Sequence, residues 1–471
     1  MTINSLNFLC FIIIVFILYY NPIKSTRIIQ NRVILISSWI FYLLVDYRTF
    51  PILLVSTILF WYLGELIYQK PKKVSLRIQL LGVIAGTFLL LYFKYYNFFI
   101  TSFSSFFNQL GIQSNWNTLH IILPIGISFY TFKLISYLVE IRKKNIPPCH
   151  NFFDFATYIA FFPTISSGPI DRPYTFLPQL ERKRDFNYQL AVDGMQQILW
   201  GIFKKMVIAD NIATIVDNTW LNYTQEYATT LIWTSILYSI QIYADFSGYS
   251  DMSIGVGKLL GFNISTNFKM PYFTRNMAEF WRKWHISLTS WFMDYIYKPL
   301  GGSRVPRIIH LRNILIVFIV SGLWHGANWT FVLWGAYHGI ILCILIILHT
   351  PKYKEPIANT ALYPSFKEIL QMVSVFILST VGWILFRANS ITDAIGYFHR
   401  ILTTSWLHIP TMHSNICIYI LLMITAEWCT RKYEHPFQTH HRQTKYVLYF
   451  ILTYLIIYHQ GQPSGFIYFQ F

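Results

Sequence analysis

Residues 321–339, SGLWHGANWTFVLWGAYHG, decide how the rest of the chain is interpreted. His325 closely follows the apolar run 314–320 (ILIVFIV), and a second apolar run begins soon after it. This pattern predicts that His325 and Asn328 lie at membrane depth. An ionisable side chain there is costly unless it faces a protein interior or a wet cavity, so the stretch indicates a functional centre buried in the bilayer.

The composition indicates a polytopic membrane protein. Of the 471 residues, 54% are hydrophobic and only 12% are charged, whereas soluble domains carry about 25% charged residues. Long apolar runs recur along the whole chain, as membrane spans require. We therefore predict an all-α fold.

The formal net charge of +17 does not indicate nucleic-acid binding here, because the basic residues occur in short clusters between apolar runs. We interpret the clusters as positive-inside anchoring against anionic lipid. Attraction of a phosphate-rich substrate is the alternative. The clusters lie at 70–73, 142–144, 182–184 and 204–205. The five cysteines show no CxxC or Cys/His spacing, so neither a disulfide nor a metal site is predicted.

The order of apolar and polar runs predicts one membrane domain over residues 1–471, with roughly 11–13 helices, some not fully spanning. The first run is interpreted as a retained span, because no basic region precedes it. Pro163 and the loop 167–173 interrupt the pattern, and breaks at membrane depth indicate re-entrant structure. Predicted spans cover 6–20, 32–45, 50–68, 79–100, 123–142, 229–245, 309–323, 329–349, 367–386, 416–429 and 446–458.

Two stretches have the periodicity of amphipathic helices lying at the membrane interface. One covers residues 188–210. The other covers 271–297 and places His285 at the edge of its apolar face, turned inward or sideways and away from lipid. That face consists of Trp281, Trp284, Leu288, Trp291 and Tyr295, spaced three and four residues apart.

His325 is the main candidate for chemistry. A neutral imidazole can accept a proton from a hydroxyl or thiol as a bond forms, and then return it. A core histidine hydrogen-bonded between helices explains the same residue equally well. Gly322 and Gly326 permit close approach of backbone or ligand. Asn328, one helical turn on, is placed to orient the imidazole ring.

The other polar candidates are weaker. His338 lies 13 residues after His325 in a Tyr-His-Gly setting, from which it could point into the same cavity, but it is predicted to be mainly structural. Asp245, Ser247 and Asp251 either line a polar path or cap the next segment, and capping is favoured for Ser247. Since no GxSxG, P-loop, HExxH or dinucleotide motif occurs, direct acyl transfer between two bound substrates is more natural than a covalent enzyme intermediate.

Residues 245–304, DFSGYSDMSIGVGKLLGFNISTNFKMPYFTRNMAEFWRKWHISLTSWFMDYIYKPLGGSR, resemble the core signature of the membrane-bound O-acyltransferase (MBOAT) superfamily. The resemblance is closest to the alginate O-acetyltransferase branch and covers nearly the whole chain. It continues through 321–339 and through PIGISFYTFKLISYLVE (124–140), GPIDRPYTFLPQL (168–180), FKKMVIADN (203–211), VGWILFRANS (381–390) and FIYFQF (466–471).

The resemblance implies a ring of helices around a thinned centre, with a tunnel joining the two membrane faces and a catalytic core at about 120–345. The principal histidine of the family corresponds to His325, and its second histidine to His285. His325 is expected to act as general base or acyl-positioning group. His285 is expected to line the substrate tunnel, together with Trp324, Asn328, Asp245 and Ser247.

By the same resemblance, the chain is expected to move an acetyl group from cytoplasmic acetyl-CoA, without a tightly bound cofactor. The final acceptor is an exported polysaccharide such as an alginate-like polymer, peptidoglycan or lipopolysaccharide. An extracytoplasmic acetyltransferase or esterase-like partner is expected, and the location is the bacterial inner membrane. Two alternatives stay open: D-alanyl transfer to a wall polymer, and a transporter or flippase, against which the lack of an internal repeat counts.

Overall fold

A computed structural model describes residues 3–21, 26–112, 116–351, 353, 355–359, 361–439 and 442–467. Within these ranges the regular elements are helices, and the described residues contain no strand. The chain separates into two compact units, Met1–Gly194 with Ser253–Ser265, and Met195–Met252 with Thr266–Phe471. Helices α9 (Tyr188–Ile202) and α11 (Ala228–Leu259) contribute residues to both.

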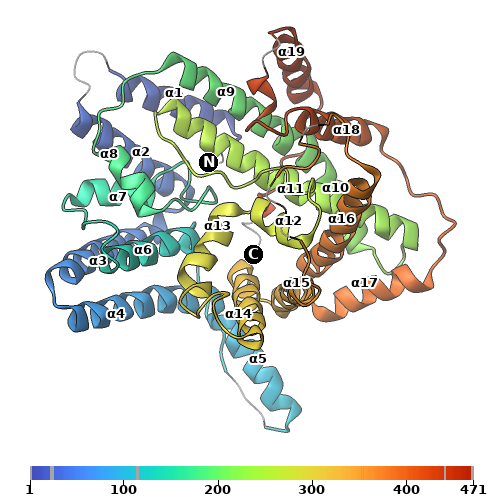
Figure 1. Ribbon diagram of the computed structural model, residues 1–471, viewed down its shortest axis with the longest axis horizontal. Coiled ribbons are helices and arrows are strands. Elements are labelled where there is room, and N and C mark those ends of the chain that lie inside the picture. The colour runs from blue at the N-terminus through green and yellow to red at the C-terminus, as the bar shows by residue number, and fades with distance from the viewer. Residues whose placement is uncertain are drawn as a thin grey trace. The chain divides into compact units, whose positions relative to one another are not determined.

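The first unit contains eight further α-helices (Figure 1). They are α1 (Leu6–Tyr19), α2 (Arg27–Asp46), α3 (Phe50–Gln69), α4 (Lys72–Leu90), α5 (Tyr96–Gln109), α6 (Ile127–Arg142), α7 (Phe152–Ala160) and α8 (Pro173–Leu180). The second unit contains α10 (Asp210–Leu221), α12 (Met277–Lys283), α13 (Ile286–Phe292), α14 (Arg307–His325), α15 (Trp329–Ile347), α16 (Phe366–Arg387), α17 (Ile391–Thr403), α18 (Ser414–Cys429) and α19 (Arg442–Tyr458). Shorter turns are η1 (Tyr47–Thr49), η2 (Leu91–Tyr95), η3 (Phe203–Ala209), η4 (Met293–Tyr297) and η5 (Pro436–Gln438).

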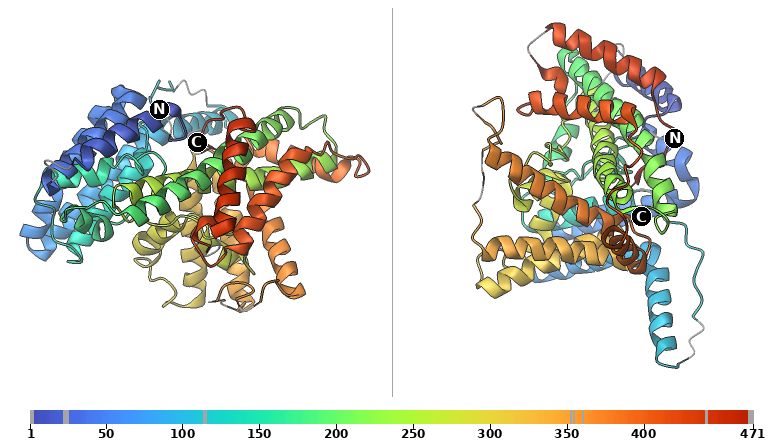
Figure 2. Two further views of the ribbon diagram at one scale, coloured as in Figure 1. Left: turned by 90° about the horizontal axis from the view of Figure 1, so that it is seen from above. Right: turned by 90° about the vertical axis from the view of Figure 1, so that its right-hand side faces the viewer.

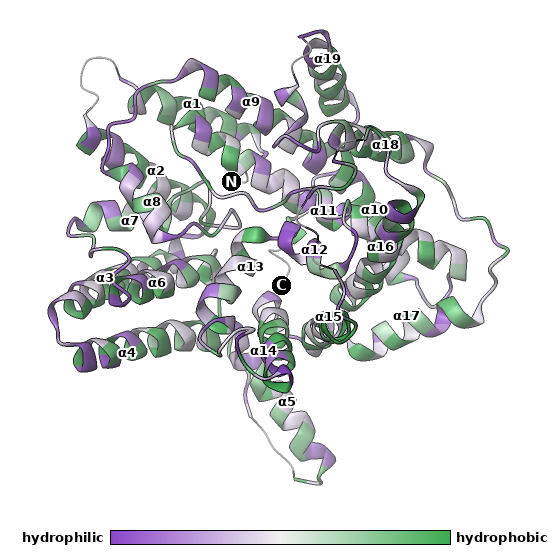
Figure 3. Ribbon diagram, in the orientation of Figure 1, coloured by the Kyte–Doolittle hydropathy of each residue, from purple (hydrophilic) through white to green (hydrophobic). Residues whose placement is uncertain are grey.

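The apolar helices confirm the prediction of a polytopic, all-helical membrane protein. Among the described residues, five segments are long and apolar enough to cross a membrane, and α1 and α18 are shorter apolar helices. Hydrophobic residues dominate α15 in Figure 3. The five segments are Arg27–Gln69, Lys72–Gln109, Arg307–His325, Trp329–Ile347 and Phe366–Arg387.

The predicted break near Pro163 is present in the first unit. Residues 161–172 between α7 and α8 are non-helical and buried. Side chains from other segments satisfy the freed backbone groups: the Ser253 hydroxyl donates to the Pro163 carbonyl at 2.5 Å, and the Ser38 hydroxyl accepts from the Phe162 N–H at 3.1 Å. Irregular backbone is tolerated at membrane depth when the protein supplies such partners.

The predicted span 229–245 does not end at Asp245. Helix α11 continues without a break through this region for 32 residues. Ser247 lies in its interior and is buried, so it does not cap a helix. The helix continues because its polar residues face protein rather than water. Asp245, for example, pairs with buried Lys205.

The predicted interfacial helix at 271–297 is also wrong. This region forms two short helices, α12 and α13, which are separated at Trp284 and His285. The tryptophans that were assigned to the membrane interface are buried in the second unit. Aromatic rings of α15 and α16 cover two of them: Trp281 packs against Trp334, and Trp284 against Trp383. The inward orientation predicted for His285 is confirmed.

The prediction of an interfacial helix over the other amphipathic stretch, 188–210, is wrong at the C-terminal end of that stretch. Helix α9 passes into the π-helical turn η3, which carries Lys204 and Lys205. Both side chains are at most 5% exposed and pair with carboxylates of Asp251, Asp245 and Asp210. The sequence pattern indicated that this basic cluster anchors the chain to lipid headgroups. The buried ion pairs show that it does not.

Helices α14 and α15 form a close antiparallel pair, and the right-hand view of Figure 2 shows them side by side in yellow and orange. Glycines allow the close approach predicted for this stretch. A Cβ atom added at Gly322 would lie 2.1 Å from the Phe331 carbonyl oxygen, and one added at Gly335 would lie 2.2 Å from that of Phe318. The backbone of either helix cannot shift locally to relieve such short contacts.

Gly322→Val is therefore expected to destabilise the protein by ~1–3 kcal/mol or more, because α14 and α15 must move apart. The midpoint of thermal unfolding in detergent measures the effect. Ile340→Val, at an exposed position of α15, is the control and is expected to leave the midpoint nearly unchanged. An unchanged midpoint for Gly322→Val would contradict the close packing of this pair.

Candidate active site

His325 is the last residue of α14 and is only 5% exposed. Three aromatic rings meet its imidazole edge-on: Trp324 and Trp334 at centroid distances of 5.0 Å, and Phe386 at 5.3 Å. Phe386 belongs to α16 and Trp334 to α15. His325 thus faces the interior of the second unit and not lipid, as the cost of burying an ionisable group predicted.

His285 occupies the break between α12 and α13. Its backbone has a left-handed conformation, with φ of 43°, which is uncommon for a residue other than glycine. Asn267 supports the break, because its carbonyl accepts a hydrogen bond from the Ile286 N–H at 2.9 Å and its side-chain oxygen accepts one from the Ser287 hydroxyl at 2.6 Å. Such conformations persist only where surrounding structure holds them, and they concentrate at functional sites.

The two histidines contact the same indole. The Trp324 ring lies 5.0 Å from the His325 ring and 6.1 Å from the His285 ring, measured between centroids. Trp324 is itself buried. The fold therefore brings together two imidazoles that are 40 positions apart in the sequence, and it does so in an aromatic environment from which bulk water is excluded.

Asn328 does not have the orienting position that was predicted for it. Helix α14 ends at His325, so Asn328 is not one turn further along the same helix. Its side-chain oxygen instead accepts from the Thr330 N–H at the start of α15, and its amide nitrogen donates to the Asn389 carbonyl at 2.7 Å. Both polar atoms of Asn328 are thereby engaged away from the imidazole ring.

His338 is fully buried in the same aromatic cluster, next to Trp281 and Trp334 at centroid distances of 4.9 and 5.0 Å. A Cβ added at Gly382 would lie 2.5 Å from His338 Nε2, so α15 and α16 are tightly packed there. This environment agrees with a structural role for His338.

Asp245 belongs to a buried ion cluster and precedes Phe246, which contacts His285. Lys205 Nζ lies 2.7 Å from an Asp245 oxygen and 2.8 Å from an Asp210 oxygen. Burial works to lower the pKa of Lys205, but the charges of the two carboxylates outweigh it and raise this pKa above its ordinary value. The next residue after Asp245, Phe246, packs edge-on against His285 at 4.6 Å.

The C-terminal segment is tied to this ion cluster. The Ile467 N–H donates to Asp245 Oδ2 at 2.8 Å, and the Ser464 hydroxyl donates to Asp210 Oδ1 at 2.5 Å. Phe466, which lies between them in the sequence, packs against Tyr249. The remaining residues of the predicted terminal motif, 468–471, lie outside the described residues.

Sequence reasoning missed Lys205 and Asp210 as neighbours of the site. The signal was present in FKKMVIADN (203–211), where two lysines stand in an apolar setting, but it was assigned to lipid anchoring. Ser247, expected along the path, is buried in α11 near Asp245 and its hydroxyl has no hydrogen-bond partner among the described residues.

The arrangement keeps the His285 imidazole in its neutral form. Burial lowers the pKa of His285 to about 3, so its ring is uncharged at neutral pH and is a weaker base than an exposed imidazole. The surrounding rings of Trp324, Trp334 and Phe386 present little polar surface, which strengthens every electrostatic interaction with a bound substrate.

Comparison with known proteins gives a consistent result. The model of the MBOAT, membrane-bound O-acyltransferase family, matches residues 142–353, which include both histidines. A probable alginate O-acetylase of Pseudomonas aeruginosa is 36% identical over 78% of this chain and 68% of its own length. A peptidoglycan O-acetyltransferase of Helicobacter pylori is 32% identical over 93% of this chain and 91% of its own.

A third relative represents a different transferred group. The teichoic acid D-alanyltransferase of Bacillus subtilis is 30% identical over 46% of this chain and 58% of its own length. The family match and the long alignments agree with the helical membrane architecture. This chain therefore belongs to the membrane-bound O-acyltransferase family and is an acyltransferase.

Proposed function

We propose that this acyltransferase moves an acetyl group from cytoplasmic acetyl-CoA across the bacterial inner membrane for O-acetylation of an exported cell-surface polysaccharide. One structural observation carries the proposal: His325 and His285 contact the same buried indole, Trp324. Two relatives that align with most of this chain are a probable alginate O-acetylase and a peptidoglycan O-acetyltransferase.

The proposed reaction needs only proton transfer and positioning. The oxygen of an acceptor hydroxyl attacks the thioester carbonyl carbon, so that a C–O bond forms and the C–S bond breaks. His325 takes the hydroxyl proton and returns it to the departing thiolate, which leaves as a thiol. Holding both substrates in line at one buried point supplies much of the rate. His285 lines the path and helps to position the acyl group.

Peptidoglycan is the acceptor to test first, because the similarity to the Helicobacter pylori enzyme extends over almost the whole of both chains. Alginate-like polymers and lipopolysaccharide are the other acceptors of this proposal. We further propose that an extracytoplasmic acetyltransferase or esterase-like protein receives the acetyl group and completes the transfer to the polymer.

D-alanyl transfer is the second candidate function, and the similarity to a teichoic acid D-alanyltransferase favours it. That similarity covers less than half of this chain, whereas the O-acetylating relatives match most of it. A transporter or flippase stays an alternative with no comparable support.

Donor assays in membranes distinguish these functions. Membranes that contain this chain and its exported partner are supplied either with radiolabelled acetyl-CoA or with labelled D-alanine loaded on a carrier protein. We expect label from acetyl-CoA to enter polysaccharide in a form that mild alkali releases, as an oxygen ester. Label from D-alanine alone would overturn acetyl transfer, and label from neither would overturn both forms of acyl transfer.

A further inference from the structure

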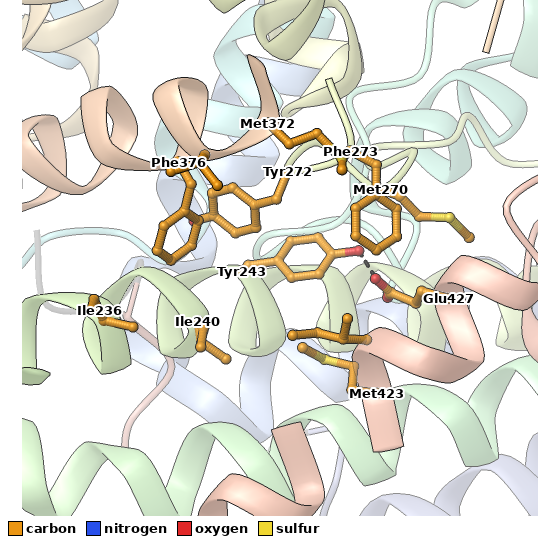
Figure 4. A pocket seen from close by; sticks show the side chains of 12 residues that line it. Ile236, Ile240, Tyr243, Met270, Tyr272, Phe273, Met372, Phe376, Met423 and Glu427 are labelled. Carbon is orange, nitrogen blue, oxygen red and sulfur yellow. Dashed lines mark hydrogen bonds between the residues drawn. The ribbon is translucent and has the colours of Figure 1, made fainter. Parts of the chain in front are cut away.

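A cavity with a volume of about 370 Å³ lies in the second unit, lined by residues from α11, α16 and α18 and from the loop before α12. This volume falls within the range of small-ligand sites, ~300–1,000 Å³. Figure 4 shows the Tyr243 ring extending across the cavity toward Glu427. The proposed acyl transfer does not use this cavity.

The polar groups in the cavity wall are already satisfied by the protein. The Tyr243 hydroxyl donates to Glu427 Oε1 at 2.9 Å, and Lys204 Nζ lies 3.9 Å from the same carboxylate. The Tyr272 hydroxyl donates to the Ser239 carbonyl at 2.6 Å. A bound molecule therefore needs to provide neither hydrogen bonds nor charge. A polar molecule would lose its hydrogen bonds to water on entering the cavity.

The remaining wall is apolar and adaptable. Met270, Met372 and Met423 line it, and methionine side chains adjust to irregular apolar ligands better than branched ones. Met270 also has a left-handed backbone, with φ of 48°. A residue other than glycine in this conformation marks a segment that the surrounding structure holds under strain, as occurs at ligand sites.

Two apolar side chains that line the cavity are also exposed at the surface of the unit. Val373 on α16 is 48% exposed and Ile424 on α18 is 40% exposed, and both line the cavity. Helix α16 is one of the segments apolar enough to cross a membrane. Hydrocarbon is the apolar material that such a surface meets in a bilayer.

We propose that this cavity binds the hydrocarbon chain of a membrane lipid, which enters between α16 and α18 and ends near Tyr243 and Glu427. The inner wall adjoins the candidate active site, since Tyr243 and Tyr272 both pack against Trp284, the residue before His285. Binding of the chain does not depend on which acyl group the enzyme transfers.

Photochemical labelling tests the proposal. The full-length protein is placed in nanodiscs that contain a phospholipid with a diazirine in its acyl chain, or, in a second arm, a diazirine-bearing polyprenyl phosphate. After irradiation, labelled peptides are identified by mass spectrometry. We expect label concentrated on the peptides that contain Met372 and Met423. The arm that gives it identifies the lipid as bulk phospholipid or as carrier lipid.

Two variants that fill the mouth make the test specific. Val373→Trp is expected to lower labelling of these peptides about tenfold, because the indole displaces the buried chain. Ile424→Trp closes the mouth from the opposite side and is expected to do the same. The matched control is Ile377→Trp, one turn along α16, at a residue that is exposed and does not line the cavity. Uniform label over all apolar helices, or equal labelling in Val373→Trp and Ile377→Trp, would overturn the proposal.

Discussion

Replacing His325 with alanine is expected to lower the rate of acyl transfer by about 10²–10⁴-fold, the usual contribution of a positioned general acid or base. The rate is measured as transfer of labelled acetyl to polysaccharide in membranes. Because the His325 side chain is buried among Trp324, Trp334 and Phe386, the amount of folded protein in the membrane must be measured in parallel. His325→Gln keeps most of the volume and is expected to lose activity to a similar degree.

His338→Gln provides the matched control for this result. His338 is buried in the same aromatic cluster and contacts the same Trp334 ring, but it lies outside the proposed path. We expect the activity of the His338→Gln variant, per folded molecule, to stay within a few-fold of that of the wild type. Equal losses in the two glutamine variants would indicate that the aromatic cluster, and not proton transfer at His325, limits the rate.

The second large effect concerns the buried ion cluster. Lys205→Met leaves Asp245 and Asp210 buried without their shared cation, and breaking a buried pair in this way costs ~3–5 kcal/mol. The midpoint of thermal unfolding in detergent should fall sharply. Activity should fall with it, because the same cluster holds the C-terminal segment and the part of α11 that contacts His285.

A surface pair serves as the control for this prediction. Lys298 lies 2.6 Å from Asp294, but its side chain is 67% exposed, so Lys298→Met is expected to cost less than ~1 kcal/mol. Adding Asp245→Asn and Asp210→Asn to Lys205→Met removes the unpaired charges and should recover part of the lost stability. A thermal midpoint for Lys205→Met equal to that of Lys298→Met would contradict the described ion cluster.

The burial of His325 could be predicted from the sequence, because apolar runs on both sides require the imidazole to face protein. The close approach of α14 and α15 could also be predicted, from the glycine at 322. Both follow from local sequence and from the cost of exposing polar groups to lipid. The family resemblance added His285 as a site residue. Its contact with Trp324 depends on the bend of the backbone at 284–285, and side-chain spacing does not reveal that bend.

The errors have one common cause. Polar residues of α11 were assigned to a polar path or a helix cap, and lysines of η3 to lipid headgroups, because their partners were unknown. Lys205 neutralises Asp245 from 40 positions earlier in the chain, so neither residue disrupts the buried helix that carries it. The tryptophans of α12 and α13 were placed at the interface for the same reason. Long-range partners of buried polar and aromatic groups are not encoded in local periodicity.

The central claim is that this chain supports O-acetylation of a surface polysaccharide through His325. Its most direct test is the ester-linked acetate that mild alkali releases from the polysaccharide of cells whose own copy of the gene is deleted. These cells carry either the wild-type chain or His325→Ala, at equal amounts in the membrane. We predict that the wild-type chain restores the acetate and His325→Ala leaves it at the level of the deletion. Full restoration by His325→Ala would contradict the claim.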